Sequence, residues 1–238
     1  MIYKYYGASN GSSALELLKK IVENNTLMAS KPFTFNDPFE FKIAIDFDAD
    51  DETIQKRYFK DNPTKTFQEY QNWKQGFIQS QWYVRQSLRV DILNKFGVIC
   101  LTNEFQNHLM WSHYATDHQG FCIGFDKSIV KSIEGVMWHE NVNYLDEIPV
   151  FRYFYDNENE FPKKVLFSKL RDWQYEKEFR IITDKQGIVN LSIPCVREVI
   201  LGCRAFNELR QYADEKLDTN ENLFYQMVEN DQKYSLNK

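Results

Sequence analysis

The strand-like segments of this chain gather late in the sequence and do not alternate strictly with helical segments. Gly97–Thr102 and Phe121–Phe125 are short apolar runs bounded by turn-forming residues, which is typical of buried strands. A doubly wound parallel sheet needs regular alternation of strands and helices. The pattern therefore predicts an α+β fold whose core is a mixed or antiparallel sheet with flanking helices. The other strand candidates are Ile2–Tyr6, Phe41–Phe47, Val136–Tyr144, Phe179–Thr183, Ile188–Ile193, Val196–Leu201 and Leu223–Val228.

Helical patterns precede and interrupt these strands. Apolar residues at three- and four-residue spacing after Ser13 predict a first helix. Residues 52–60 and 65–95 also have helical patterns, so we expect a helical insertion at 52–95 between the first strands and the rest of the chain. Such an insertion could act as a lid or carry specificity elements, although packing alone would explain its apolar residues. Two further helices are expected, at Asn107–His118 and Asn207–Leu217.

Length and composition limit the class of protein. With 238 residues and 43% apolar content, the chain can form one sizeable core, and we expect a single compact domain, 1–238. The formal net charge of −5 gives no electrostatic reason to expect a duplex nucleic acid as partner. No signal peptide or membrane-spanning stretch is evident, so we expect a cytoplasmic protein that makes no membrane contact. The four cysteines form no Cys-x-x-Cys pair, which argues against a structural zinc site.

The segment from Trp173 to Arg180 places charged side chains in what the pattern predicts to be a buried strand. Successive side chains of a strand point to opposite faces, so Glu176, Glu178 and Arg180 would share one face. Charged groups are costly to bury unless they are paired or used. This face is therefore a candidate substrate site. A simple ion pair of Glu178 with Arg180, or an i,i+4 pair of Glu176 with Arg180 if the segment were helical, would also explain the charges.

The expected helix Asn107–His118 carries a second candidate surface. At 100° per residue, a stripe of mixed aromatic and polar side chains falls on one side of it. Such a stripe suits a flat heterocycle, but core packing of its aromatic rings is an equally good interpretation. His108, His113 and His118 are five residues apart and cannot converge from one regular helix, so we predict no metal site there. The stripe consists of Asn107, Trp111, Tyr114 and His118.

Common catalytic motifs are absent from the sequence. There is no Gly-x-x-x-x-Gly-Lys phosphate loop, no Gly-x-Ser-x-Gly elbow and no Gly-x-Gly-x-x-Gly dinucleotide fingerprint. Cys100 and Cys122 lie in apolar runs where a thiolate is disfavoured, so a cysteine nucleophile is weakly supported. The carboxylate pair Glu176 and Glu178 is what remains as a candidate for chemistry.

Several stretches together resemble a bacterial family known as domain of unknown function 2971. They span most of the chain in the order expected of that family, and their combination is more specific than any one of them. The stretches are Tyr3-Lys4-Tyr5, Phe35-Asn36-Asp37-Pro38-Phe39-Glu40, Met110-Trp111-Ser112-His113-Tyr114-Ala115 with His118 and Gly120-Phe121-Cys122, Val142-Asn143-Tyr144, and Lys169 with Trp173, Tyr175-Glu176, Glu178 and Arg180.

A more distant similarity points to an activity. A strand-borne Glu-x-Glu late in a compact α+β domain resembles the catalytic corner of ADP-ribosyltransferases that use NAD. The resemblance implies that Glu178 is the catalytic carboxylate and Glu176 its partner. It also implies a cofactor-binding role for residues earlier in the chain, with aromatic rings stacking on the nicotinamide and cations meeting the pyrophosphate. Those candidate cofactor-binding residues are Lys4, Asn36, Trp111, Tyr114 and Arg180.

Three functions remain open at this point. The first is an NAD-consuming ADP-ribosyltransferase or glycohydrolase, a toxin or phage-defence effector that binds a small-molecule nucleotide and acts on a protein or nucleic-acid acceptor. The second is a non-catalytic ligand-binding or regulatory protein in which Asn36, Asp37, Trp111 and Arg180 form a pocket or hold the core together. The third is a metal-dependent nuclease, which requires four carboxylates to converge within a few ångströms. Those carboxylates are Asp37, Glu40, Glu176 and Glu178.

Overall fold

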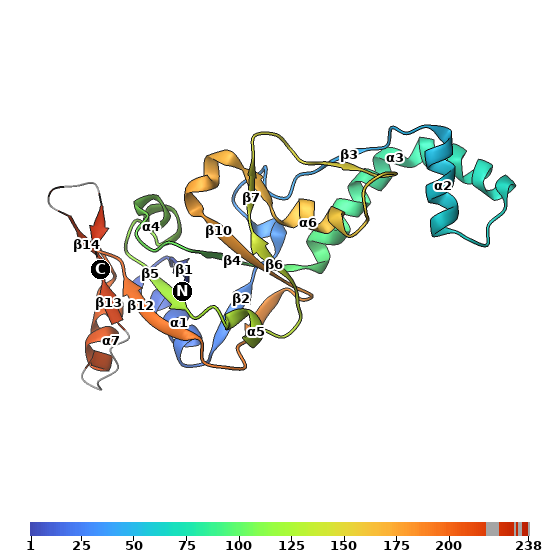
Figure 1. Cartoon of the computed structure of the whole chain (residues 1–238). Coiled ribbons are helices and arrows are strands. Elements are labelled where there is room, and N and C mark those ends of the chain that lie inside the picture. Colours follow the sequence, from blue (N-terminus) through green and yellow to red (C-terminus); the bar gives the residue numbers. More distant parts are fainter. Residues whose placement is uncertain (218–223, 231, 233–234, 238) are drawn as a thin grey trace. The chain divides into compact units, whose positions relative to one another are not determined.

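The computed structural model describes residues 1–217, 224–230, 232 and 235–237. Contacts within the chain divide it into two compact units (Figure 1). Unit 1 comprises Met1–Lys31, Phe96–Val142 and Asp172–Lys238, and unit 2 comprises Pro32–Lys95 and Asn143–Arg171. Each unit is described by itself.

A seven-stranded mixed sheet forms the centre of unit 1, and it confirms the expected α+β fold with a mixed sheet at its core. The strand order is β13-β12-β5-β1-β4-β10-β6. All neighbours are antiparallel except β12 and β13, which are parallel. The strands are β1 (Ile2–Tyr6), β4 (Gly97–Thr102), β5 (Phe121–Phe125), β6 (Val136–Asn141), β10 (Glu178–Thr183), β12 (Val196–Leu201) and β13 (Phe224–Gln226).

Smaller elements complete unit 1. Strand β2 (Thr26–Ala29) pairs with β11 (Gly187–Asn190), and β14 (Val228–Glu229) pairs with β15 (Leu236–Asn237). The helices are α1 (Gly11–Val22), α4 (His108–Tyr114), α5 (Ile129–Ser132) and α7 (Asn207–Leu217), together with the 3₁₀ helix η2 (Arg171–Glu176), whose first residue belongs to unit 2.

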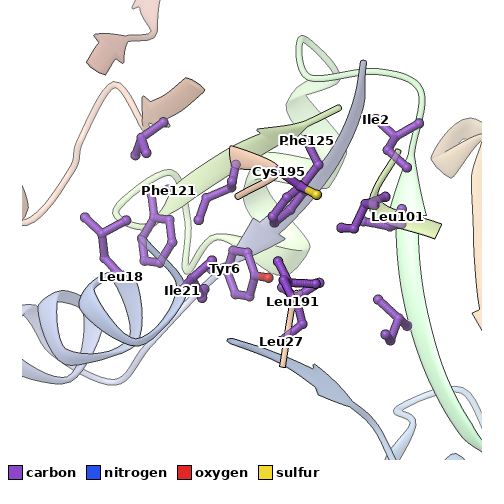
Figure 2. Close-up of a cluster of buried hydrophobic side chains, with 14 of the residues drawn as sticks. Ile2, Tyr6, Leu18, Ile21, Leu27, Leu101, Phe121, Phe125, Leu191 and Cys195 are labelled. Atoms are coloured by element: carbon purple, nitrogen blue, oxygen red, sulfur yellow. The ribbon is translucent and has the colours of Figure 1, made fainter. Parts of the chain in front are cut away.

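Helix α1 begins at Gly11, three residues earlier than the start expected after Ser13. The side chain of Asn10 caps its N-terminus by accepting a hydrogen bond from the backbone N–H of Ser13 at 2.9 Å. Its apolar stripe is buried through Ala14, Leu18 and Ile21. Figure 2 shows Leu18 and Ile21 projecting into a cluster of apolar side chains. This cluster is the larger apolar core of unit 1.

The two faces of the sheet differ in chemistry. One face contributes the apolar core just described, with Ile99, Phe121, Ile123 and Ile181 among its fully buried side chains. Alternation along the strands sends the intervening residues to the opposite face. That face, here called the mixed face, packs a second cluster against Met110 and Trp111 of α4. The sheet residues of this second cluster are Tyr3, Tyr5, Cys122 and Ile200.

Unit 2 contains the expected helical insertion. Its helices α2 (Asp51–Asp61) and α3 (Phe67–Lys95) match the segments predicted at 52–60 and 65–95. Aromatic rings fill this unit, for example Phe77, which packs edge-on against Phe47 with ring centroids 5.3 Å apart. The other elements are the 3₁₀ helix η1 (Pro32–Thr34), helix α6 (Glu160–Leu166), and two parallel pairs, β3 (Ala44–Asp46) with β8 (Val150–Arg152) and β7 (Asn143–Leu145) with β9 (Ser168–Leu170).

Several predicted boundaries are wrong. The helix expected to reach His118 ends at Tyr114, because Thr116, Asp117 and His118 all adopt the left-handed conformation, with φ of +48°, +52° and +69°. The strand expected over Phe41–Phe47 shortens to β3. The one expected over Val136–Tyr144 divides into β6 and β7. The final predicted strand begins at a residue outside the described part of the chain.

Candidate functional site

The predicted pair of Glu178 and Arg180 lies on one face of β10, as strand alternation requires. The Arg180 guanidinium donates two hydrogen bonds to the carboxylate, from Nε to Oε1 at 2.8 Å and from Nη2 to Oε2 at 3.0 Å. The side chain of Arg180 is 0% exposed and that of Glu178 is 4% exposed. Both carboxylate oxygens are therefore held in a fixed orientation inside the sheet.

Glu176 reaches the same region in a different way from the one predicted. It is the last residue of the 3₁₀ helix η2 rather than part of the strand, and Lys177 then turns the chain with φ of +45°. The Thr102 hydroxyl holds this turn by donating to the Glu176 carbonyl oxygen at 2.6 Å. The expected three-charge strand face is thus wrong in its geometry, although Glu176 is buried close by.

Tyr114 of α4 contacts the Glu176 carboxylate. Its hydroxyl donates to Oε1 of Glu176 at 2.5 Å. Burial raises the pKa of Tyr114 well above its usual value, and the charges of Glu176 and Glu178 raise it further. The phenol therefore stays protonated at neutral pH and acts as a hydrogen-bond donor. Two carboxylates and one phenol from separate elements make up the centre of the candidate site.

A row of side chains crosses the mixed face beyond the predicted residues. The register pairs Glu178 with Thr102, Thr102 with Tyr3, Tyr3 with Gly124 and Gly124 with Glu198. Glu198 is 3% exposed. Burial raises the pKa of Tyr3, and a hydrogen bond with Glu198 raises it further. A third buried carboxylate thus lies on the same face as Glu178, four strands away.

Glu198 was missed by the sequence analysis, although a signal was present. It lies in the apolar strand β12, where alternation places it on the same face as Ile200. Val196 packs on the opposite, apolar face, because the strand has an irregular register between Val196 and Glu198. Gly124 leaves the space that Tyr3 and Glu198 need. A Cβ at position 124 would lie 2.6 Å from Cγ of Glu198 and 3.0 Å from Cε1 of Tyr3.

The remaining predicted cofactor-binding residues have different surroundings. Trp111 is fully buried, donates from Nε1 to the Phe105 carbonyl oxygen at 2.7 Å, and packs in the core as the packing interpretation predicted. Lys4 alternates with Tyr3, so it leaves the sheet away from the mixed face, and its ammonium donates to the Cys100 carbonyl oxygen at 3.1 Å. Asn36 is an exposed residue of unit 2.

A group of partly exposed rings adjoins Tyr114. His113 lies next to it in α4, and the His113 Nδ1 is 2.9 Å from the Tyr175 hydroxyl oxygen. The Trp173 and Tyr175 ring centroids are 6.0 Å apart, and the His113 ring lies 6.2 Å from that of Trp173. Trp173 and Tyr175 are half-buried while His113 is exposed. These rings provide the accessible aromatic surface that was predicted for Trp111.

Other chemistries receive less support from the geometry. Burial raises the pKa of the Cys100 and Cys122 thiols, so neither is poised as a thiolate nucleophile. Among the described residues, no group of three or more His, Cys, Asp or Glu side chains is arranged to hold a metal ion. In unit 2, Glu40 pairs with Lys169, their charged atoms Oε2 and Nζ lying 3.5 Å apart. Across the described ranges, no helix combines the length and apolar character needed to span a membrane.

Fold and site together define an α+β protein with a seven-stranded mixed sheet, one face of which carries the buried carboxylates of Glu178 and Glu198. Residues 110–181 match the family described as "Protein of unknown function (DUF2971)". The match spans Trp111, Tyr114, Glu176, Glu178 and Arg180, and so supports the family resemblance over the centre of the candidate site. Comparison with curated proteins and with solved structures gave no match.

Proposed function

We propose that the protein is an NAD-consuming enzyme of the ADP-ribosyltransferase or glycohydrolase type. The observation that carries the proposal is the Tyr114 hydroxyl, which is hydrogen-bonded to Glu176 and lies within the electrostatic influence of Glu178, near the partly exposed rings of Trp173 and Tyr175. The Glu-x-Glu spacing agrees with the resemblance that suggested this chemistry.

The chemistry assigns a role to each group. Cleavage of the bond between nicotinamide and ribose passes through an oxocarbenium-like state, which a fixed carboxylate stabilises, as in glycoside cleavage. Glu178 is that carboxylate, and Arg180 fixes its orientation. Glu176 and Tyr114 position the ribose hydroxyls, while Trp173 and Tyr175 offer flat surfaces to the nicotinamide ring. Nicotinamide leaves with the bonding electrons, and water or a nucleophile of a protein or nucleic-acid acceptor takes its place at the ribose carbon.

The test is nicotinamide release from NAD, measured with and without cell lysate as a source of acceptor. Wild-type protein should release nicotinamide, and Glu178→Gln should lower the rate by about 100-fold or more, the usual scale for loss of one electrostatic group. Glu134→Gln, an exposed glutamate of the same unit, is the matched control and should keep the full rate. Absence of nicotinamide release by the wild-type protein under both conditions would contradict the proposal.

A double variant distinguishes a loss of catalysis from a loss of stability. Glu178→Gln removes the negative charge that the buried Arg180 guanidinium pairs with on β10, which itself lowers stability. Glu178→Gln/Arg180→Met removes both charges, so its melting temperature should return toward that of the wild type while nicotinamide release stays lost. If the double variant recovers activity together with stability, Glu178 has no catalytic role.

A second candidate function rests on a specific observation. Both oxygens of Glu178 are already bound by Arg180, and the pair is almost completely buried, which suits a structural ion pair in a non-catalytic ligand-binding or regulatory protein. Under this alternative, the double variant keeps both its fold and its ligand affinity. Under the enzyme proposal, the double variant keeps its fold but loses the nicotinamide release that the wild type shows.

A further inference from the structure

Unit 2 contains a pocket that the proposed enzymatic site does not use. Its volume is about 270 Å³, just below the range of about 300–1,000 Å³ that is common for small-molecule sites. The walls come from three segments: the turn at Phe39 and Lys42, the loop that follows β7, and strand β9. Phe39, Leu145, Ile148, Pro149 and Leu170 give it a mainly apolar lining.

A buried ion pair gives one wall of this pocket a fixed polar group. The Lys169 side chain, which lines the pocket, is 6% exposed, and its ammonium lies 3.5 Å from Oε2 of Glu40, whose side chain is 2% exposed. Burying two charges is costly, and it is tolerated when the charges are paired. Glu40 thus neutralises Lys169, and the pair contributes no net charge to the pocket.

The second cation of the pocket, Lys42, is in a different position. Its ammonium lies 4.2 Å from the centroid of the Phe39 ring, a cation–π contact that holds it beside the apolar wall. Over the residues that the structure describes, Lys42 forms no ion pair. It therefore supplies a positive charge that a ligand can neutralise.

The acidic residues of the pocket do not cancel that charge. Asp146 is paired with Arg171, whose Nε lies 2.6 Å from Oδ1 of Asp146. Glu147 is exposed, and solvent screens its charge. What remains is a mainly apolar pocket in which the Lys42 ammonium lies beside the Phe39 ring.

We infer that this pocket binds a small carboxylate with a flat or branched apolar body, such as an arylcarboxylate. The body packs against Leu145, Ile148 and Leu170, and the carboxylate accepts a charge-assisted hydrogen bond from the Lys42 ammonium. The site lies within unit 2, so the inference stands whether or not the chain cleaves NAD.

Titration calorimetry of the full chain with phenylacetate and with its neutral counterpart phenylacetamide tests this inference. The carboxylate should bind saturably, and the amide at least about tenfold more weakly, because a charge-assisted contact is roughly twice as strong as a neutral one. Lys42→Met keeps the apolar stem and removes the charge, and it should weaken phenylacetate by about tenfold or more while leaving phenylacetamide unchanged.

The matched control is Lys56→Met, an exposed lysine of α2 that does not line the pocket, and it should bind phenylacetate as the wild type does. Comparison of acid and amide on the wild-type protein needs no variant, so the test holds even if Lys42→Met folds poorly. The inference is overturned if phenylacetate shows no saturable binding up to about 10 mM, a Kd that corresponds to about 3 kcal/mol. It is equally overturned if acid and amide bind alike, or if Lys42→Met binds the acid as tightly as the wild type.

Discussion

The two faces of the seven-stranded sheet are made from the same strands but solve different physical problems. On one face, Ile181 packs with Ile99, Phe121 and Ile123 in a continuous apolar cluster. On the other, the neighbouring residue Arg180 is equally buried but carries a charge that must be matched by Glu178. The apolar face gains free energy from each buried side chain, at about 25 cal/mol per Å². The mixed face must offset the desolvation of its charges with hydrogen bonds.

The difference between the two faces shows that the desolvation cost of burying charges falls on the mixed face. Apolar residues of similar volume could replace a buried ion pair without loss of stability, and often with a gain. The charged and phenolic groups of the mixed face are thus not needed for the fold alone. That argument supports the assignment of the candidate site to the mixed face rather than to the apolar one.

The largest expected effect concerns Arg180. Arg180→Ala removes the two hydrogen bonds that the guanidinium donates to the buried Glu178 carboxylate and should lower the free energy of unfolding by about 3–5 kcal/mol. Glu178→Leu/Arg180→Met should restore it to near the wild-type value. On the opposite face, Ile181→Val removes one methylene group and should cost about 0.5–1.5 kcal/mol. Urea unfolding measures the stability of all three variants. If Arg180→Ala lowers the free energy of unfolding by less than Ile181→Val does, the proposed difference between the two faces is wrong.

An intermediate effect is expected at Gly124, which lets two polar side chains of the mixed face meet. Gly124→Ala places a methyl group 2.6 Å from Cγ of Glu198, so the Tyr3–Glu198 contact must shift, at a cost of about 1–3 kcal/mol. Gly76→Ala in α3 is the control, because a Cβ there meets nothing within 4 Å, and it should stabilise by about 0.5–1 kcal/mol. A lower melting temperature for Gly124→Ala and a higher one for Gly76→Ala, each relative to the wild type, would support this account. Equal effects of the same sign would count against it.

The smallest expected effect is a pH dependence at His118, whose ring stacks on that of Trp111 with centroids 6.4 Å apart. Burial lowers the pKa of the His118 imidazole, and Arg204 lowers it further. The unfolded chain therefore binds a proton more readily, at a pKa of about 6.5, and stability falls as the pH drops from about 6.5 toward the folded pKa.

The His118→Gln variant tests this dependence. The unfolding free energy of the variant should fall less than that of the wild type between pH 8 and pH 5. Parallel curves would show that His118 does not contribute. The apolar face carries no comparable pH dependence from Ile181 or its apolar neighbours, which sharpens the contrast between the faces.

The sequence predicted elements whose signals are local. Strand β10 with Glu178 and Arg180 on one face follows from period-two alternation, and α2 and α3 follow from helical spacing. The position of Glu176 could not be predicted in this way. Lys177 adopts a left-handed conformation without a glycine or asparagine to mark it, and tertiary contacts such as that from Thr102 hold the turn.

Local signals also predicted part of the candidate site. Tyr114 and Glu178 were named, and the structure brings them into one electrostatic network. Trp111 was named as a stacking residue, but spacing along a helix cannot tell which side of that helix a sheet will cover. The pairings of unit 2, such as β3 with β8 and β7 with β9, join segments far apart in the chain and leave no periodic signal.

The Glu178–Arg180 pair joins residues only two positions apart, and this has a consequence for the order of folding. Closing so short a loop costs little chain entropy, so the two charges can meet while β10 is still an isolated extended segment. The segment then enters the sheet as an electrically neutral unit, and the desolvation of each ion is met by a partner that is already in place. In a cross-strand pair, each charge would remain unpaired until the neighbouring strand docks. Its desolvation would oppose sheet assembly until the pair formed.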